Sequence, residues 1–240
     1  MSKIAFVFIP NSYNGPCITE SGPKVFEFIL KKNNYNGDYF MFNLDWNESL
    51  NEYMKRITTE LKKIISEHDK VVVFGGNHLS LLPVYNATNK ANYSSLTLDA
   101  HRDYLYNDGT ITHGSFLRFL DKNNVKRYII GFRDKISEEN KYSFFDKEIS
   151  VKSYKLNNKI EFDDIKYVDI DVDVLDKKIF PYTVCLIDNG LLLKELMNIL
   201  NTISFEYIKV LSFSEYAYVL DKKKKGLKII LNIIDKYLAK

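Results

Sequence analysis

Short apolar runs alternate with longer amphipathic patterns along the chain. The runs are rich in β-branched and aromatic residues, and several are apolar at consecutive positions, which is typical of strands covered on both faces. We therefore predict strands at IAFVFI (4–9), YFMFNL (39–44), KVVVFGG (70–76), SLTLDA (95–100), RYIIGF (127–132), YVDIDV (167–172) and IKVLSF (208–213).

Apolar residues at helical spacing predict helices between these strands. One apolar face extends from Leu50 to Ile65 and another from Leu227 to Leu238, and a third helix is predicted from Gly190 to Ile203. Alternating strands and helices are typical of a parallel sheet between layers of helices. We predict a three-layer α/β/α fold with a mostly parallel sheet of about eight strands. The length favours a single domain over residues 1–240.

Composition excludes several classes of protein. A net charge of +3 is too small to indicate a nucleic-acid partner, and the run Lys222 to Lys225 is predicted to be a solvated loop. No apolar stretch reaches the roughly 18 residues of a membrane span. The opening MSKIAFVFIP has too short an apolar core for a signal peptide and is predicted to form the first strand. Cys17 and Cys185 lie too far apart for a disulfide framework or a zinc ribbon. These features predict a cytoplasmic, reduced protein.

Acids and imidazoles follow four of the predicted strands, at the end where parallel sheets bind ligands. They are His78 after the strand 70–76, Asp99, His101 and Asp103 after 95–100, Asp171, Asp173 and Asp176 at the end of 167–172, and Glu215 after 208–213. Side chains alternate along an extended chain, so Asp99, His101 and Asp103 can converge on one point, and so can Asp171 and Asp173.

Such a cluster of carboxylates needs compensating charge, because each buried carboxylate costs several kcal/mol. The same segments hold no cluster of lysines or arginines, so metal cations are the natural compensation, and two divalent ions would balance four aspartates. Carboxylate and imidazole ligands without thiolate fit Mn²⁺, with Fe²⁺, Co²⁺, Ni²⁺ and Zn²⁺ as alternatives. A two-metal site would also activate a bridging water.

These segments resemble the ureohydrolases, the family of arginase and agmatinase. The resemblance rests on GGNHLS, DAHRD, HGS, DVDVLD and SFSEY in the family's order, on the opening GPCITESGPKVFEFIL and on the strand IIGFRD. It extends over nearly the whole chain and implies the arginase-like fold. It implies two Mn²⁺ sites, one formed by His78, Asp99, Asp103 and Asp171, and one by His101, Asp99, Asp171 and Asp173.

The resemblance also implies roles for three further residues. A metal-bridging hydroxide would attack the guanidinium carbon of the substrate and release urea and an amine, as in a hydrolase of linear amidines. Glu215 would pair with the guanidinium, or else be a capping carboxylate. His113 would shuttle a proton to the leaving amine, and Asp176 would orient a ligand or the bridging solvent. The family further implies a homo-oligomer, a trimer or a hexamer.

The chain departs from the family pattern at several positions. Asn77 replaces an Asp, and Asp169 replaces a Ser and is expected either to reach the metals or to pair with a base on its other side. The loop 181–190, PYTVCLIDNG, keeps its length but lacks most of the family's glycines, so it must follow a different path.

The residue two positions after the DAHRD segment bears on the identity of the substrate. Arginases have an Asn there that holds the amino-acid end of the substrate, and here it is Leu105, which cannot hydrogen-bond a carboxylate. The resemblance therefore favours an agmatine-like guanidino compound over L-arginine. Tyr104 and Tyr106 are predicted either to contact an amine tail or to serve as packing residues.

Three alternatives remain open. GGNH resembles the Gly-Asn-His of two-metal phosphoesterases, but the expected Asp-x-His does not precede it and no histidine follows His113. Zinc deacetylases share the ureohydrolase fold, but they resemble a one-metal version of this site. A ureohydrolase homologue that keeps its metals without turnover, for a structural or regulatory role, is the third alternative.

Overall fold

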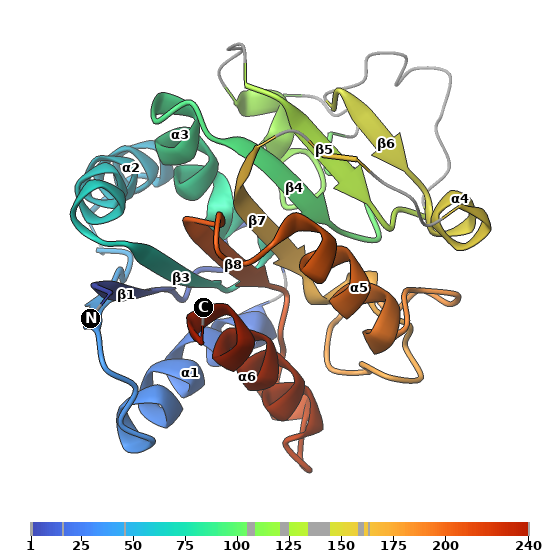
Figure 1. The fold of residues 1–240 in the computed structure, drawn as a ribbon. Helices are drawn as coiled ribbons and strands as arrows, with labels where there is room; N and C mark the ends of the chain where they lie inside the picture. Colours follow the sequence, from blue (N-terminus) through green and yellow to red (C-terminus); the bar gives the residue numbers. More distant parts are fainter. Residues whose placement is uncertain are drawn as a thin grey trace.

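The strands form one parallel sheet. The computed structural model describes residues 2–15, 17–45, 47–104, 109–120, 125–133, 145–157, 161–162 and 164–239. Eight strands pair in the order β2-β1-β3-β8-β7-β4-β5-β6, and every pair is parallel (Figure 1). They are β1 (Ile4–Ile9), β2 (Asp38–Met41), β3 (Lys70–Gly75), β4 (Ser94–Leu98), β5 (Arg127–Ile130), β6 (Lys147–Ile149), β7 (Ile165–Asp171) and β8 (Val210–Ser214). The predicted sheet is confirmed.

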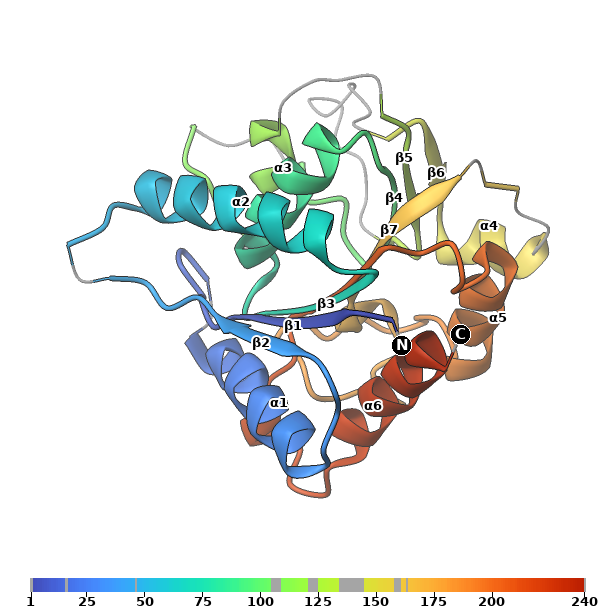
Figure 2. The same ribbon diagram turned by 60° about the vertical axis from the view of Figure 1, so that its left-hand side comes forward.

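Helices cover both faces of the sheet (Figure 2). Helices α2 (Leu50–Glu67) and α3 (Leu82–Lys90) pack on one face, and α1 (Ser21–Lys32), α4 (Val151–Leu156), α5 (Leu193–Ile203) and α6 (Lys225–Leu238) pack on the other. In β1, Phe6 and Phe8 contribute to the core beneath α1 and α6, whereas Ala5 and Val7 contribute to the core beneath α2. Consecutive apolar residues are needed because both faces of each strand are buried.

Local sequence sets where α2 begins. Ser49 caps the helix by accepting a hydrogen bond from the backbone N–H of Glu52, and the Glu52 carboxylate accepts one from the backbone N–H of Ser49. This reciprocal pair satisfies two N–H groups that the first turn leaves without helical partners. The predicted apolar face from Leu50 to Ile65 is buried against the sheet.

The sequence misplaced the start of one helix and missed one strand. The helix predicted from Gly190 begins at Leu193, because Gly190 packs against the backbone of Asp176, where a Cβ atom would lie 2.4 Å from the Asp176 nitrogen. Strand β6 was not predicted, since its three residues at the edge of the sheet include Lys147 and Glu148 and show no apolar run.

The strand order explains why distant sequence segments meet. Strands β3, β8, β7 and β4 are consecutive neighbours in the sheet. These are the four strands that carry the predicted site residues at their carboxyl ends. Because the strands are parallel, all four ends lie at the same edge of the sheet.

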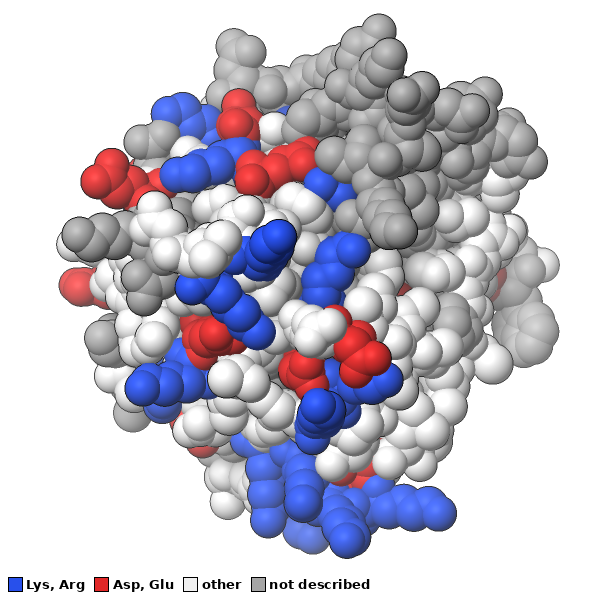
Figure 3. Space-filling view, turned by 90° about the vertical axis from the view of Figure 1, so that its right-hand side faces the viewer, with Lys and Arg blue, Asp and Glu red and all other residues white. Residues whose placement is uncertain are grey.

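The surface carries mixed charge. Figure 3 shows Lys and Arg side chains interspersed with Asp and Glu on one face, with a group of basic side chains at its lower end. The run Lys222 to Lys225 is exposed at the turn that leads into α6, as predicted for a solvated loop. Among the helices described, none has the length and apolar character needed to cross a membrane.

Gly131, just after β5, provides a test of how tightly this edge of the sheet is packed. Its φ is +112°, and an added Cβ would lie 2.3 Å from Val174 Cγ2 and 3.0 Å from the Asp99 carbonyl oxygen. We predict that Gly131→Ala lowers the free energy of unfolding by about 3 kcal/mol, because backbone strain and overpacking add. Denaturant unfolding measures the loss.

Gly109→Ala is the matched control for that substitution. Gly109 also has a positive φ, +97°, but no described residue beyond its chain neighbours has an atom within 4 Å of the point where an added Cβ would lie. Backbone strain alone should lower the free energy of unfolding by about 1 kcal/mol. Equal losses in the two variants would contradict the packing argument.

Candidate metal centre

The turn after β3 places His78 at the edge of the sheet. Gly76 allows a close approach to the segment after β1, because an added Cβ would lie 2.2 Å from the Asn11 carbonyl oxygen. Asn77 caps the short helix that starts at His78 by accepting a hydrogen bond from Ser80 N at 3.3 Å. Its amide group also donates to the Tyr13 carbonyl at 3.1 Å. An Asp at this position could not make that second bond, so Asn77 is suited to this turn.

Three carboxylates converge on one ring nitrogen of His78. His78 Nδ1 lies 3.1 Å from Asp99 Oδ2, 2.8 Å from Asp103 Oδ2 and 3.3 Å from Asp171 Oδ2. All four side chains are buried. These are the four residues that the resemblance assigns to one metal, and they come from three different strand ends.

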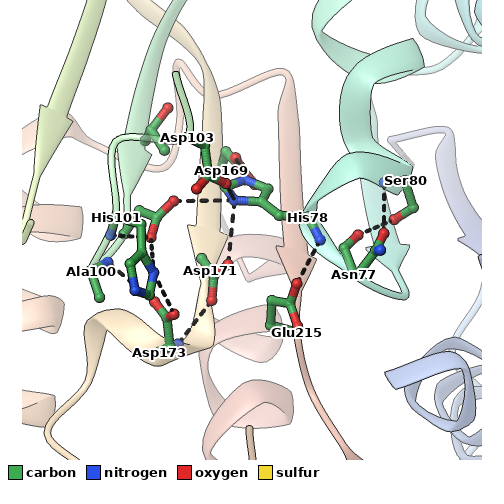
Figure 4. A network of polar contacts seen from close by, with 12 residues as sticks. Asn77, His78, Ser80, Ala100, His101, Asp103, Asp169, Asp171, Asp173 and Glu215 are labelled. Atoms are coloured by element: carbon green, nitrogen blue, oxygen red, sulfur yellow. Dashed lines mark hydrogen bonds and ion pairs between the residues drawn. The ribbon is translucent and has the colours of Figure 1, made fainter. Parts of the chain in front are cut away.

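A second group forms beside the first and shares Asp99. His101 Nδ1 lies 3.0 Å from Asp173 Oδ2 and 3.7 Å from Asp99 Oδ1 (Figure 4). In each of the two groups His78–Asp99–Asp103 and Asp99–His101–Asp173, the ligand atoms lie within 4.8 Å of one another. Asp171 is held in place because its Oδ1 accepts a hydrogen bond from Asp173 N at 3.0 Å.

The donor atoms of this cluster fit metal ions. Among the described residues, the buried Glu215 Oε2 has no hydrogen-bond partner, and the buried His78 Nδ1 and Asp99 Oδ2 face each other at 3.1 Å without hydrogen-bond geometry. Buried polar atoms without partners are uncommon and are usually satisfied by something not in the chain. Imidazole nitrogen and carboxylate oxygen are ligands for first-row divalent ions, so the residues present fit the predicted pair of cations.

The electrostatics of the metal-free protein show the same need for compensation. Burial and the neighbouring Asp99 carboxylate raise the pKa of Asp103 to about 7. Burial lowers the pKa of His101, but the carboxylates of Asp173 and Asp99 outweigh it and raise that pKa to about 12. Protons therefore balance the acids in the metal-free protein, and bound metal ions would replace them.

The cluster opens into a small cavity. Its volume is about 140 Å³, and its lining includes seven of the nine predicted site residues: His78, His101, Asp103, His113, Asp171, Asp173 and Glu215. Asp99 is buried beside them. His113 is half-buried, with its Nδ1 3.4 Å from the Asn14 carbonyl oxygen. Gly114 and Cys185 complete the lining.

Glu215 lines the cavity and is fixed by one of its carboxylate oxygens. Its Oε1 accepts a hydrogen bond from His78 N at 2.9 Å (Figure 4), and its Oε2 is buried without a hydrogen-bond partner among the described residues. Glu215 adopts a φ of +63°, an unfavourable conformation for a residue with a side chain, and its backbone N–H bonds the Gly76 carbonyl at 2.8 Å. This conformation holds the side chain between β8 and the turn after β3.

Asp176 does not line the cavity. Its carboxylate accepts hydrogen bonds from Lys178 N at 3.0 Å and Gly190 N at 3.1 Å. It therefore ties together the two ends of the loop that includes residues 181–190. The loop contributes Cys185 to the cavity. The sequence contained no signal for that contact, because it depends on the path of the loop.

Asp169 pairs with a base rather than lining the cavity. Its Oδ2 lies 2.7 Å from His78 Nε2 and accepts a hydrogen bond from Tyr85 OH at 2.6 Å, and its Oδ1 accepts one from Ser212 Oγ at 2.7 Å. Tyr85 and Ser212 were not predicted as site residues, since a Tyr in an amphipathic helix and a Ser in a buried strand resemble ordinary core residues.

Tyr104 is a packing residue. It is buried, its ring lies 6.1 Å from that of Phe145, and its hydroxyl donates to Glu148 Oε1 at 3.0 Å. The predictions for Leu105 and Tyr106 fall outside the described residues.

The fold and this cluster define an α/β protein with a candidate two-cation site at the carboxyl edge of its sheet. The sequence model described as "Arginase family" matches residues 31–239, most of the chain. The chain therefore belongs to the arginase family. No curated protein matches it in sequence.

Solved structures show the same fold. Arginase from Bacillus subtilis superposes with a TM-score of 0.81 at 18% identity over 99% of both chains. A putative agmatinase from Clostridium difficile gives 0.78 at 20% identity over 99% of this chain and 95% of that one. Proclavaminate amidino hydrolase from Streptomyces clavuligerus gives 0.79 at 16% identity over 99% of this chain and 91% of that one.

The ionisation of Glu215 makes a prediction about pH. Burial raises the pKa of Glu215 from 4.5 to about 8 in the metal-free protein. The unfolded chain then releases this proton at a lower pH than the folded one, so stability falls as pH rises from about 4.5 to 8. Glu215→Gln removes this loss, and at pH 8 the metal-free variant should be roughly 2–4 kcal/mol more stable than wild type.

Denaturant unfolding in the presence of a chelator, at pH 4.5 and pH 8, measures this difference. The two proteins should be similar at the lower pH, because Gln keeps the oxygen that accepts from His78 N. A difference that does not change with pH would contradict the raised pKa of Glu215.

Proposed function

We propose that this protein hydrolyses a C–N bond of a guanidino compound and releases urea and an amine, with two Mn²⁺ ions as cofactor. The observation that carries the proposal is the convergence of six ligand residues in two groups that share Asp99, beside a cavity that Glu215 lines. His78, Asp99, Asp103 and Asp171 would hold one ion, and His101, Asp99, Asp171 and Asp173 the other. Such ions supply Lewis acidity and an activated water nucleophile.

Glu215 is positioned to bind the cationic group of the substrate. Glu215 lines the cavity, and its buried Oε2 has no partner among the described residues. A guanidinium offers N–H donors and a positive charge to such a carboxylate. Because Oε1 is held by His78 N, the carboxylate is oriented before the substrate binds. Binding would therefore place the guanidinium carbon beside the carboxylate cluster.

His113 is the candidate that gives a proton to the leaving amine. The half-buried His113 lines the same cavity, and it does not belong to either group of ligands. An imidazole in that position can accept a proton from the nucleophile and donate it to the departing nitrogen. Asp176 would act indirectly, by holding the loop that carries Cys185 against the cavity.

The cavity favours a substrate without a carboxylate. Among the described residues of its lining, none is Lys or Arg, and four are Asp or Glu. The described lining therefore offers no cationic side chain that could pair with a substrate carboxylate. Together with the predicted role of Leu105, this favours agmatine over L-arginine. Similar solved structures include a putative agmatinase and a proclavaminate amidino hydrolase.

The homo-oligomeric state, a trimer or a hexamer, and the cytoplasmic location of the protein stay predictions.

The second candidate is a homologue that binds metals without turnover. The altered loop 181–190 favours it, since this loop places the thiol of Cys185 in the cavity wall instead of the family's small residues. Both candidates predict bound cations, and only hydrolysis distinguishes them.

A urea-release assay with Mn²⁺-loaded protein tests the function. We expect urea from agmatine, with a kcat/KM at least about tenfold above that for L-arginine. Glu215→Gln should lower kcat/KM by about 10²–10³ while both metals stay bound, because the guanidinium loses its charged partner.

Glu195→Gln is the matched control. Glu195 accepts a hydrogen bond from Leu192 N at 2.7 Å at the start of α5 and is not among the residues that line the cavity, so its change should leave turnover intact. Absence of urea across a broad panel of guanidino compounds, with two metals bound, would favour the homologue without turnover.

His113 can be tested separately. We predict that His113→Asn lowers kcat by about 10²-fold or more with a smaller effect on KM, because proton transfer is lost and binding is kept. Steady-state kinetics across pH measures both, and added imidazole should restore part of kcat. An unchanged pH profile with unchanged kcat would remove His113 from the mechanism.

A further inference from the structure

Asp169 is a fully buried carboxylate behind one of the two candidate metal sites. It is 0% exposed, and it contacts three side chains that are also buried: His78, Tyr85 and Ser212. It lies on β7, two residues before Asp171. Both of its oxygens are occupied by these contacts, so Asp169 is not available as a metal ligand.

The register of the sheet holds Asp169 in place. Asp169 pairs with Thr97 of β4 on one side and with Ser212 of β8 on the other. Ser212 Oγ donates a hydrogen bond to the Asp169 carboxylate. The hydroxyl of Tyr85, on α3, also donates to this carboxylate, and it lies 2.7 Å from Thr97 Oγ1. Three adjacent strands and a helix therefore fix the position of one carboxylate.

Asp169 determines which nitrogen of His78 faces the metal site. The carboxylate lies 2.7 Å from Nε2, so an Nε2–H would donate to Asp169 and leave the lone pair of Nδ1 for a metal ion. That nitrogen is the one on which Asp99, Asp103 and Asp171 converge (Figure 4). A carboxylate behind a ligating imidazole fixes its orientation and makes it a stronger ligand.

His101 has no such support. Its side chain is 29% exposed, compared with 1% for His78. Its Nδ1 faces Asp173 and Asp99, and among the described residues its Nε2 has no hydrogen-bond partner. The two histidines thus differ in burial, in orientation and in the charge behind the ring.

We propose that Asp169 is a positioning residue that makes the two cation sites unequal, so that the site of His78 retains its ion while the site of His101 exchanges it. The proposal rests on the metal-binding part of the proposed function and not on the reaction. The family pattern has an uncharged Ser at this position. The replacement therefore adds a charge at one of the two sites only.

Titration of the metal-free protein with Mn²⁺ in a calorimeter tests the proposal. Wild type should bind two ions with affinities that differ by at least about tenfold. Asp169→Asn should weaken the tighter class by about 10–100-fold and leave the weaker class nearly unchanged. His101→Asn should instead remove the weaker class and leave one tightly bound ion.

Asp38→Asn is a chemically matched control. Asp38 Oδ2 lies 2.9 Å from Nε2 of the buried His68, at the start of β2, away from the cavity. This substitution also removes a carboxylate behind an imidazole, but it should change neither class of site. Tyr85→Phe is a second variant, which removes one hydrogen bond to Asp169 and should weaken the tighter class by a smaller factor.

A measurement on His78 itself keeps the proposal testable if Asp169→Asn unfolds. With ¹⁵N-labelled histidine and diamagnetic Zn²⁺, the Nε2–H resonance of His78 should be protected from exchange and should shift in Tyr85→Phe. An Nδ1–H tautomer for His78 in the loaded protein would overturn the proposal.

The remaining outcomes separate this inference from the proposed function. Two sites of equal affinity, or equal weakening of both by Asp169→Asn, would overturn the inference even if urea is released. Unequal sites that depend on Asp169 would support it even if no urea is formed. Failure to bind any cation would overturn the inference together with the metal requirement of the proposed function.

Discussion

The structure depends on the compensation of buried negative charge. Five carboxylates, those of Asp99, Asp103, Asp171, Asp173 and Glu215, are buried around one small cavity. In the metal-free protein, burial and the neighbouring carboxylates raise the pKa values of Asp103 and Glu215, so that retained protons offset part of this charge. A cluster of this kind is costly without cations and well suited to holding them.

The parallel sheet makes the cluster possible. Four neighbouring strands, β3, β8, β7 and β4, end at the same edge and present their last side chains to one volume. Because these strands are buried on both faces, their positions are rigid. The site residues at their ends are therefore also held in fixed positions. Glu215 and Asp103, both at positive φ, show that the backbone leaves the strands in unusual conformations where the cavity begins.

A second layer of polar residues lies beneath the candidate ligands. Asp169 supports His78 through the sheet, and Asp176 holds the ends of the loop that reaches the cavity with Cys185. The sequence had already singled out both residues, Asp169 as a departure from the family pattern and Asp176 as a part of it. Their partners were not singled out, because Tyr85 on α3 and Gly190 in the loop approach from elements distant in the sequence.

The sequence alone determined the fold class, the strands that carry the site, the identity of the ligand candidates and the family resemblance, because apolar runs and alternation along a strand are local properties. It could not locate β6 or the start of α5, where packing against neighbours outweighs local pattern. Only the tertiary structure decided that Asp169 faces His78 rather than the cavity, that Tyr104 packs in the core and that Cys185 lines the site. Those outcomes depend on the order and register of the strands, which bring together residues that no spacing along the chain connects.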